Sequence, residues 1–228
     1  MHHATTKGID EETAFRHTDI QWLGDVPAHW EVKKIRRLAL VKRGASPRPI
    51  DNPIYFDDQG EYAWVRISDV SASGKYLQVT EQRLSPLGQS KSVTLQPGNL
   101  FVSIAGSVGK PIISGIKCCI HDGFVYFDGL RESPGYLYYL FAAGQLYKGL
   151  GKLGTQLNLN TDTIGSIHIP VPSADTQKRI VQFLDRTTTE LDRLASIVDV
   201  HIATLQERRA ALITAAVTGQ IDVSRETA

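Results

Sequence analysis

Residues 173–219 read SADTQKRIVQFLDRTTTELDRLASIVDVHIATLQERRAALITAAVTG, with no proline and no glycine before the last position. Apolar residues recur in this segment at a constant interval of seven, at Leu184, Leu191, Val198, Leu205 and Leu212. This period is typical of a helix whose apolar stripe packs against another helix. Such a helix would be roughly 65 Å long at 1.5 Å per residue, more than the preceding domain could cover. The segment therefore predicts a coiled-coil helix that needs a partner.

A second row of the same segment flanks this stripe. Its apolar members are Ile180, Leu194 and Ala215, and polar residues interrupt it at Thr187, His201 and Arg208. The interruptions favour control of register and partner choice over maximal stability. We expect a partner helix to contact Ile180, Leu184, Leu191, Leu194, Val198, Leu205 and Leu212. The alternative interpretation is a helix that lies along its own domain.

The ends of this helix are also marked in the sequence. Ser173 is a candidate N-cap, and Asp175 in the first turn complements the positive end of the helix dipole. Gly219 is well placed to stop the helix. We therefore assign residues 173–219 to the long helix and residues 220–228 to a C-terminal tail.

Residues 19–172 predict a separate domain. Between about Tyr62 and Val125, short β-rich runs alternate with glycine and proline turns, which is typical of a compact, curled mixed sheet. Helical periodicity follows, with Ser133 as cap and Pro134 at the first helical position. The predicted class is α+β: a curled mixed β-sheet with packed helices, followed by the long C-terminal coiled-coil helix. The polar residues 1–18 are expected to form a flexible arm.

The composition is that of a folded chain. Its 228 residues are 42% hydrophobic, enough to bury a sizeable core. No run approaches the roughly 18 apolar residues of a membrane span, and no export signal is visible, so the cytoplasm is the expected compartment and no membrane partner is expected. The neighbours Cys118 and Cys119 fit neither a mutual disulfide nor a metal site, so a buried reduced pair is expected.

Positive charge is concentrated although the net charge is only +1. Residues 32–50 contain no acidic residue but carry Lys33, Lys34, Arg36, Arg37, Lys42, Arg43 and Arg48. Such a stretch either binds phosphates or forms a solvated face. Residues 148–160 add polar side chains on a glycine-flexed segment: Lys148, Lys152, Thr155, Gln156, Asn158 and Asn160. These types bond to phosphates and base edges, but they are also ordinary loop formers.

No catalytic constellation is visible. IAGSVGKP at 104–111 resembles a phosphate-binding loop, but Ile104 stands where its first glycine is needed and Pro111 where its magnesium-binding hydroxyl is needed. We interpret it as a turn between strands, with Lys110 pointing to solvent or to phosphate. DDQGE at 57–61 is interpreted as another turn. Neither a cofactor nor a metal is expected.

Several stretches together resemble the specificity subunits of type I restriction-modification systems. WLGDVPAHWEVKKIRRL is similar to the start of a target recognition domain in that family. Further blocks that resemble the family are WVRISDV, LQPGNLFVSIAGSVGKPII, GTQLNLNTDTIGSIHIPVP, QKRIVQFLDRTTTELDRL and LQERRAALITAAVTGQIDV. The resemblance covers roughly residues 20–223.

The resemblance implies a non-catalytic subunit that reads double-stranded DNA and docks DNA adenine methyltransferase subunits, with restriction and translocase subunits as further partners. We expect phosphates to be met by Lys42, Arg43, Arg48, Lys110, Lys117 and Lys152. Base edges are expected to be met by some of Arg66, Ser68, Gln156 and Asn158.

One departure from the family is the number of domains. Family members usually carry two recognition domains and two long helices, whereas this chain shows no internal repeat. We therefore expect a half-length form that pairs with a second copy, or with another half-subunit, through antiparallel helices and reads an inverted repeat. The alternative function is a coiled-coil adaptor that binds protein, and an unmatched enzyme is a third.

Overall fold

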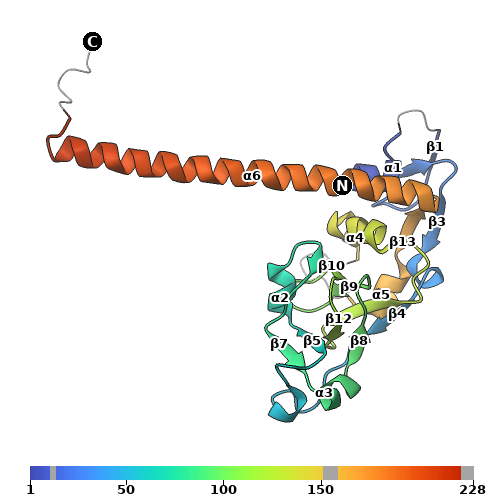
Figure 1. Ribbon diagram of the computed structural model, residues 1–228. Coiled ribbons are helices and arrows are strands. Elements are labelled where there is room, and N and C mark those ends of the chain that lie inside the picture. Colours follow the sequence, from blue (N-terminus) through green and yellow to red (C-terminus); the bar gives the residue numbers. More distant parts are fainter. Residues whose placement is uncertain (11–13, 151–158, 222–228) are drawn as a thin grey trace. The chain divides into compact units, whose positions relative to one another are not determined.

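In the computed structural model the described residues are 1–10, 14–150 and 159–221. The chain divides into two compact units, Met1–Gln182 and Phe183–Ala228. Within the described residues, the strands and the short helices all belong to the first unit (Figure 1). The predicted recognition domain lies within it.

Two mixed sheets make up most of the first unit. The five-stranded sheet has the order β4-β12-β9-β10-β6 and the four-stranded sheet the order β7-β5-β11-β8. Strands of the first are β4 (Leu40–Arg43), β12 (Phe124–Asp128), β9 (Leu100–Ser103), β10 (Pro111–Ser114) and β6 (Tyr76–Leu77). Strands of the second are β7 (Gln82–Leu84), β5 (Tyr62–Val65), β11 (Cys118–Ile120) and β8 (Val93–Leu95). The pairs β10–β6 and β11–β5 are parallel and the other pairs in these sheets antiparallel, which confirms the predicted mixed sheet.

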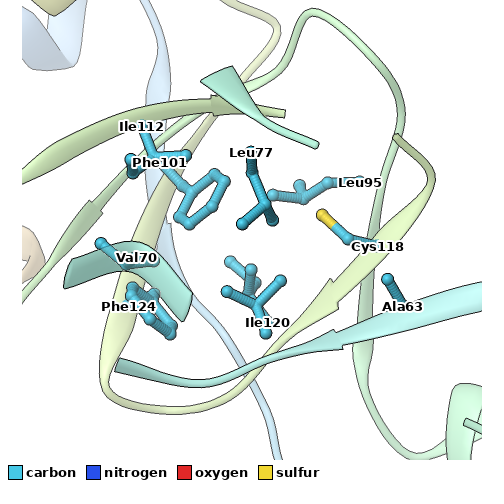
Figure 2. Close-up of a cluster of buried hydrophobic side chains, with 10 residues drawn as sticks. Ala63, Val70, Leu77, Leu95, Phe101, Ile112, Cys118, Ile120 and Phe124 are labelled. Carbon is cyan, nitrogen blue, oxygen red and sulfur yellow. The ribbon is translucent and has the colours of Figure 1, made fainter. Parts of the chain in front are cut away.

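Both sheets contribute to one apolar core (Figure 2). Phe101, Ile112 and Phe124 enter it from the five-stranded sheet, and Ile120 and Leu95 from the four-stranded one. The rings of Phe101 and Phe124 meet edge to face, with centroids 5.4 Å apart. Side-chain burial on this scale is the main stabilising contribution to such a domain.

The four-stranded sheet is buried on both faces, because successive side chains of a strand alternate between the faces. Ala63 of β5 and Cys118 of β11 face the shared core, whereas Trp64 and Cys119 face a second cluster with Leu84. Cys118 and Cys119 are both free and fully buried, as predicted. Burial raises the pKa of Cys118 to about 11 and that of Cys119 to about 12.

Short helices and 3-10 turns connect the strands of the two sheets. They are α2 (Ile67–Ala72), α3 (Pro86–Ser90), α4 (Pro134–Ala142) and α5 (Thr161–Ser166), with 3-10 turns η1 (Ile35–Arg37), η2 (Pro53–Tyr55) and η3 (Gln145–Tyr147). The predicted cap of α4 is confirmed, because the N–H of Tyr136 donates to Ser133 Oγ at 3.3 Å. Leu146, which follows α4 in the chain, lies in η3 and is buried.

The N-terminal segment differs from the expected flexible arm. Residues His2–Lys7 form α1, and β1 (Phe15–His17) pairs with β2 (Asp25–Pro27). Thr5 and Thr6 are fully buried, and the buried hydroxyl of Tyr136 donates to the carbonyl of Thr5 at 2.8 Å. The threonine hydroxyls bond to carbonyls within α1, which removes the cost of burying them. The prediction was wrong for the described part of residues 1–18 because it counted these residues as polar.

The long helix begins and ends as expected. β3 (Glu31–Lys34) pairs with β13 (His168–Val171), and α6 (Ala174–Val217) follows. The N–H of Thr176 donates to Ser173 Oγ at 3.2 Å, so Ser173 caps the helix. After the last turn Gly219 adopts φ +73°, the left-handed conformation that favours glycine at a helix end.

Candidate nucleic-acid interface

The loop after β4 is anchored on Asp122, in the turn between β11 and β12. Arg48 Nη2 donates to Asp122 Oδ2 at 3.1 Å, and Ser46 Oγ donates to Oδ1 at 3.0 Å. Arg43 Nε donates to the backbone carbonyl of Asp122. Three side chains from one short segment therefore converge on a single acidic residue.

The electrostatics of this turn keep Asp122 ionised. Partial burial by itself raises the pKa of the Asp122 carboxyl. The hydrogen bonds from Ser46 and from a backbone N–H, together with the charges of Arg48 and Arg43, lower it by more. The pKa of Asp122 therefore lies below its ordinary value. The pKa of the neighbouring His121 is lowered, mainly by burial. The charge of Asp122 raises this pKa and the charge of Arg43 lowers it, so the net direction stays downward. At neutral pH the turn thus pairs a carboxylate with a neutral imidazole.

His121 also lines an open hollow of about 630 Å³. Its walls carry aromatic and apolar groups together with hydrogen-bonding side chains: Ile50, Asp51, Pro53, Phe56, Trp64, Arg66, Gln82 and His121. The rings of Trp64 and His121 are 5.9 Å apart. A guanidinium and an amide are groups that read base edges in DNA grooves, so the hollow can take a polar, planar partner.

Arg66 and Ser68 lie close together along the chain. Arg66 Nη1 donates to Glu81 Oε2 at 2.8 Å, and its backbone N–H donates to Asp69 Oδ2 at the start of α2. Ser68 lies on the first turn of α2 and is exposed. The other residues assigned to base edges, Gln156 and Asn158, lie outside the described residues, as does Lys152.

Lys42 and Lys117 each have a carboxylate partner within the chain. Lys42 Nζ lies 2.5 Å from Asp128 Oδ2, and Lys117 Nζ lies 2.5 Å from Glu61 Oε1. These contacts raise the pKa of both lysines. Because side chains alternate along β4, Lys42 projects from the opposite face of the strand to Arg43. The structure therefore places Arg66 in the hollow and holds Arg43 and Arg48 on Asp122, the residue next to His121, whereas Lys42 pairs with Asp128.

The turn at residues 104–110 joins β9 to β10, as predicted, but Lys110 is oriented differently from the expectation. Its ammonium group donates to the carbonyls of Ser71 and Ser73 at 3.0 and 2.9 Å. These carbonyls lie at the C-terminal end of α2, where helix carbonyls lack internal partners and the dipole favours a cation. Lys110 thus holds the turn against α2, and the expectation that it points to solvent or phosphate was wrong.

The stripe on α6 divides into a buried and an exposed part. Ile180 and Leu184 are 0% and 3% exposed in the single chain. The first turns of α6 lie against α4, since a Cβ on Gly135 would approach Val181 Cγ1 to 3.2 Å. From residue 191 onward the large apolar side chains are exposed: Leu191, Leu194, Ile197, Val198, Val200, Ile202, Leu205, Leu212, Ile213 and Val217. Ile180 and Leu184 are therefore covered in the single chain, and contact of a partner helix with the stripe stays a prediction.

A further set of cations, not singled out as a site from the sequence, lies on other elements. Lys34 ends β3, Arg36 and Arg37 form most of η1, and Arg131 follows β12. The backbone N–H of Arg131 donates to the carbonyl of Leu38 at 3.2 Å, which brings Arg131 to the end of η1. Three of the four belong to the basic stretch at 32–50, but the position of Arg131 beside them is a tertiary feature.

Neither a metal cluster nor a membrane span is found among the described residues. No group of three or more His, Cys, Asp or Glu side chains there is arranged to hold a metal ion. No helix in the same residues is long and apolar enough to cross a membrane.

Known proteins are similar to this chain in sequence and in fold. The family model described as "Type I restriction modification DNA specificity domain" matches residues 27–197. The type I restriction enzyme MjaIX specificity subunit of Methanocaldococcus jannaschii is 26% identical over 183 residues, which cover 76% of this chain and 40% of that protein.

Two solved structures have a similar fold. One is described as "Structural basis underlying complex assembly and conformational transition of the type I R-M system"; it has a TM-score of 0.69 and 20% identity, covering 89% of this chain and 48% of that one. The HsdS subunit of Thermoanaerobacter tengcongensis has a TM-score of 0.59 and 18% identity, covering 79% and 41%. The chain thus spans less than half the length of these relatives. Because the family model matches from β2 into the long helix, the chain belongs to the family of type I restriction-modification DNA specificity domains.

Proposed function

We propose that this chain recognises DNA as a specificity subunit of a type I restriction-modification system and reads one half of a split target. The observation that carries the proposal is the match to a DNA specificity domain over residues 27–197. Catalysis would belong to partner subunits, namely a DNA adenine methyltransferase and, in a system that also cuts, restriction and translocase subunits. We place this activity in the cytoplasm.

The hollow beside Asp122 supports the assignment of the reading surface. Arg66 and Gln82 line it with groups that bond to base edges. Arg43 and Arg48 are held on Asp122, the residue next to His121 of the hollow, and supply cations that can meet phosphates. Because Asp122 already holds both arginine side chains in place, each loses less conformational entropy when it binds DNA.

The exposed stripe on α6 supports pairing of two chains. Leu191, Val198 and Leu205 are 58%, 54% and 62% exposed. Apolar surface repeated at this interval is stabilised when a second helix covers it. Because the chain spans 40% to 48% of the relatives named above, two copies would restore about their length. An antiparallel, symmetric pair would read an inverted repeat.

Selection from a random duplex library tests the recognition. The full-length chain is incubated with the library in rising salt, and the retained duplexes are sequenced. We expect one enriched half-site motif, because base contacts survive at salt that strips phosphate contacts. Equal retention of all sequences at every salt concentration would contradict the proposal.

A triple charge reversal of Lys42, Arg43 and Arg48 separates DNA recognition from the adaptor function. We expect the variant to lose duplex retention and to keep its oligomeric state. Unchanged retention with intact pairing would favour a protein-binding adaptor.

Co-expression with a DNA adenine methyltransferase subunit of a type I system tests the remainder of the proposal. Mapping of modified adenines across the host genome should give a split, palindromic motif. A contiguous motif, or no new modification, would contradict the paired arrangement.

A further inference from the structure

Four cations of the first unit border two adjoining hollows, and we call them the β3–η1 cluster: Lys34, Arg36, Arg37 and Arg131. Arg36 and Arg37 line both hollows, which measure about 530 and 300 Å³. Lys34 borders the larger hollow, and Arg131 borders the smaller one. The arginines of η1 thus form the shared wall between them.

The members of the cluster differ in their ion pairing from four other cations of this domain. Lys42, Arg48, Arg66 and Lys117 each form an ion pair within the chain. Across residues 1–10, 14–150 and 159–221, no carboxylate pairs with any member of the β3–η1 cluster.

The carboxylates nearest these hollows are mostly engaged elsewhere. Glu31 lines the larger hollow and pairs with Lys33, and Asp128 lines the smaller one and pairs with Lys42. Asp162 lines a third hollow together with Arg36, without an ion pair among the described residues. Of the cluster, only Arg36 therefore shares a hollow with a carboxylate that has no ion pair among the described residues.

The positive potential of this face acts on a neighbouring histidine. His168 of β13 is paired in register with Lys34 and lines the larger hollow. Burial lowers the pKa of His168, and the charges of Lys34 and Arg36 lower it further. Unpaired like charges held this close destabilise a fold unless an anion binds them.

A phosphodiester backbone fits this face better than a single small anion. It presents a row of singly charged groups that can occupy adjoining hollows, and guanidinium groups bond to phosphate oxygens in a bidentate manner. We propose that the β3–η1 cluster binds the phosphate backbone of duplex DNA, as a contact additional to the loop anchored on Asp122. This inference rests on the proposed DNA recognition and assigns part of it to residues that carry no base information.

The test compares R36Q/R37Q with the control K91Q/K178Q. Lys91 and Lys178 are exposed residues of the same unit outside the cluster, so both variants lose two positive charges. Binding of the full-length chain to a random duplex of about 30 base pairs is measured by fluorescence anisotropy across about 50–300 mM salt. We expect the slope of log affinity against log salt to fall by about 1.8 in R36Q/R37Q, at about 0.9 per phosphate contact. The control should keep the wild-type slope.

A second measurement uses His168 in the wild-type chain. Bound phosphate opposes Lys34 and Arg36, so addition of the duplex should raise the pKa of His168, followed by NMR titration of the imidazole. Failure of R36Q/R37Q to change the slope, or an unaltered His168 pKa with duplex bound, would overturn this inference and leave DNA recognition standing. If the wild-type chain retains no duplex at any salt concentration, the proposed function fails and this inference fails with it.

Discussion

Ser133 and Gln177 lie 44 residues apart in the chain, and the backbone N–H of Ser133 donates a hydrogen bond of 3.0 Å to Oε1 of Gln177. Gln177 Nε2 donates in turn to the carbonyl of Pro172 at 3.0 Å and to Glu132 Oε2 at 2.5 Å. The side chain is 1% exposed. One buried amide therefore joins the start of α4 to the start of α6.

Replacement of Gln177 by leucine should destabilise the first unit. Q177L leaves the Ser133 N–H and the Pro172 carbonyl buried without partners, at a cost of about 1–3 kcal/mol per group. We expect the free energy of unfolding in urea to fall by about 2–4 kcal/mol. The neighbouring, exposed Lys178 provides the control K178L, which should change it by less than about 0.5 kcal/mol. Equal effects of the two substitutions would show that the hydrogen bonds of Gln177 contribute nothing.

The anchor at Asp122 should matter more for the loop than for global stability. Its carboxylate is 42% exposed and Arg48 is 70% exposed, so the ion pair contributes about 1 kcal/mol or less. D122N should therefore keep the fold but speed hydrogen exchange in residues 44–50. Unchanged exchange there would mean that Asp122 does not anchor the loop.

The same variant should alter the dependence of stability on pH. The pKa of Asp122 is lower in the folded chain than its ordinary value of 3.8. Its contribution is thus present above about pH 3.8 and is lost as the pH falls through the lowered folded value. We expect the difference in unfolding free energy between wild type and D122N to shrink as the pH is lowered from 7 to about 3. A constant difference over this range would contradict the assignment.

The two cysteines should be inert in the folded chain. Their raised pKa values, about 11 for Cys118 and about 12 for Cys119, leave both thiols protonated at neutral pH. Only the thiolate reacts quickly with disulfide reagents. We expect no reaction with an aromatic disulfide reagent under native conditions and release of two equivalents per chain in denaturant. Fast native labelling of either thiol would place it outside the core.

Close backbone packing at Gly44 should make that position intolerant of a side chain. A Cβ there would lie 2.2 Å from the carbonyl oxygen of His121, which is backbone and cannot move aside freely. We expect G44A to lower the free energy of unfolding by about 1–3 kcal/mol. A Cβ on Gly74 would have no atom within 4 Å, so G74A is the matched control and should be close to neutral. Thermal unfolding of both variants measures the difference.

The exposed stripe on α6 should control self-association. L191D or L205D places an unpaired charge in an apolar seam and should separate the copies, whereas V198L should be tolerated. A210D introduces the same charge on the opposite side of the helix and is the control. Sedimentation velocity measures the assembly. An unaltered assembly in both L191D and L205D would contradict pairing through this stripe.

Much of the long helix is predictable because its determinants are local. The signals for this helix are an apolar residue at every seventh position, a serine cap and a terminal glycine, and each acts within one or two helical turns. α6 begins after Ser173 and ends before Gly219, as these signals indicate. The same holds for the cap of α4 at Ser133.

The candidate interface could not be predicted fully from the sequence, because it depends on contacts between residues that lie far apart in the chain. The basic residues looked alike in the sequence, but folding pairs Lys42 with Asp128 and turns Lys110 onto α2, while among the described residues it leaves Arg36 and Arg37 without an ion pair. The partners of the paired residues lie 86 and 39 positions away.

By itself the sequence determined the class of the fold, the resemblance to its family and the bounds of the long helix, since each depends on periodicity and on signals between near neighbours. Only the tertiary structure decided which cations keep their charge available for a partner, that the N-terminal residues pack against Tyr136, and which part of the α6 stripe remains exposed. The physical reason is that burial and ion pairing are set by side chains that meet only after the chain has folded.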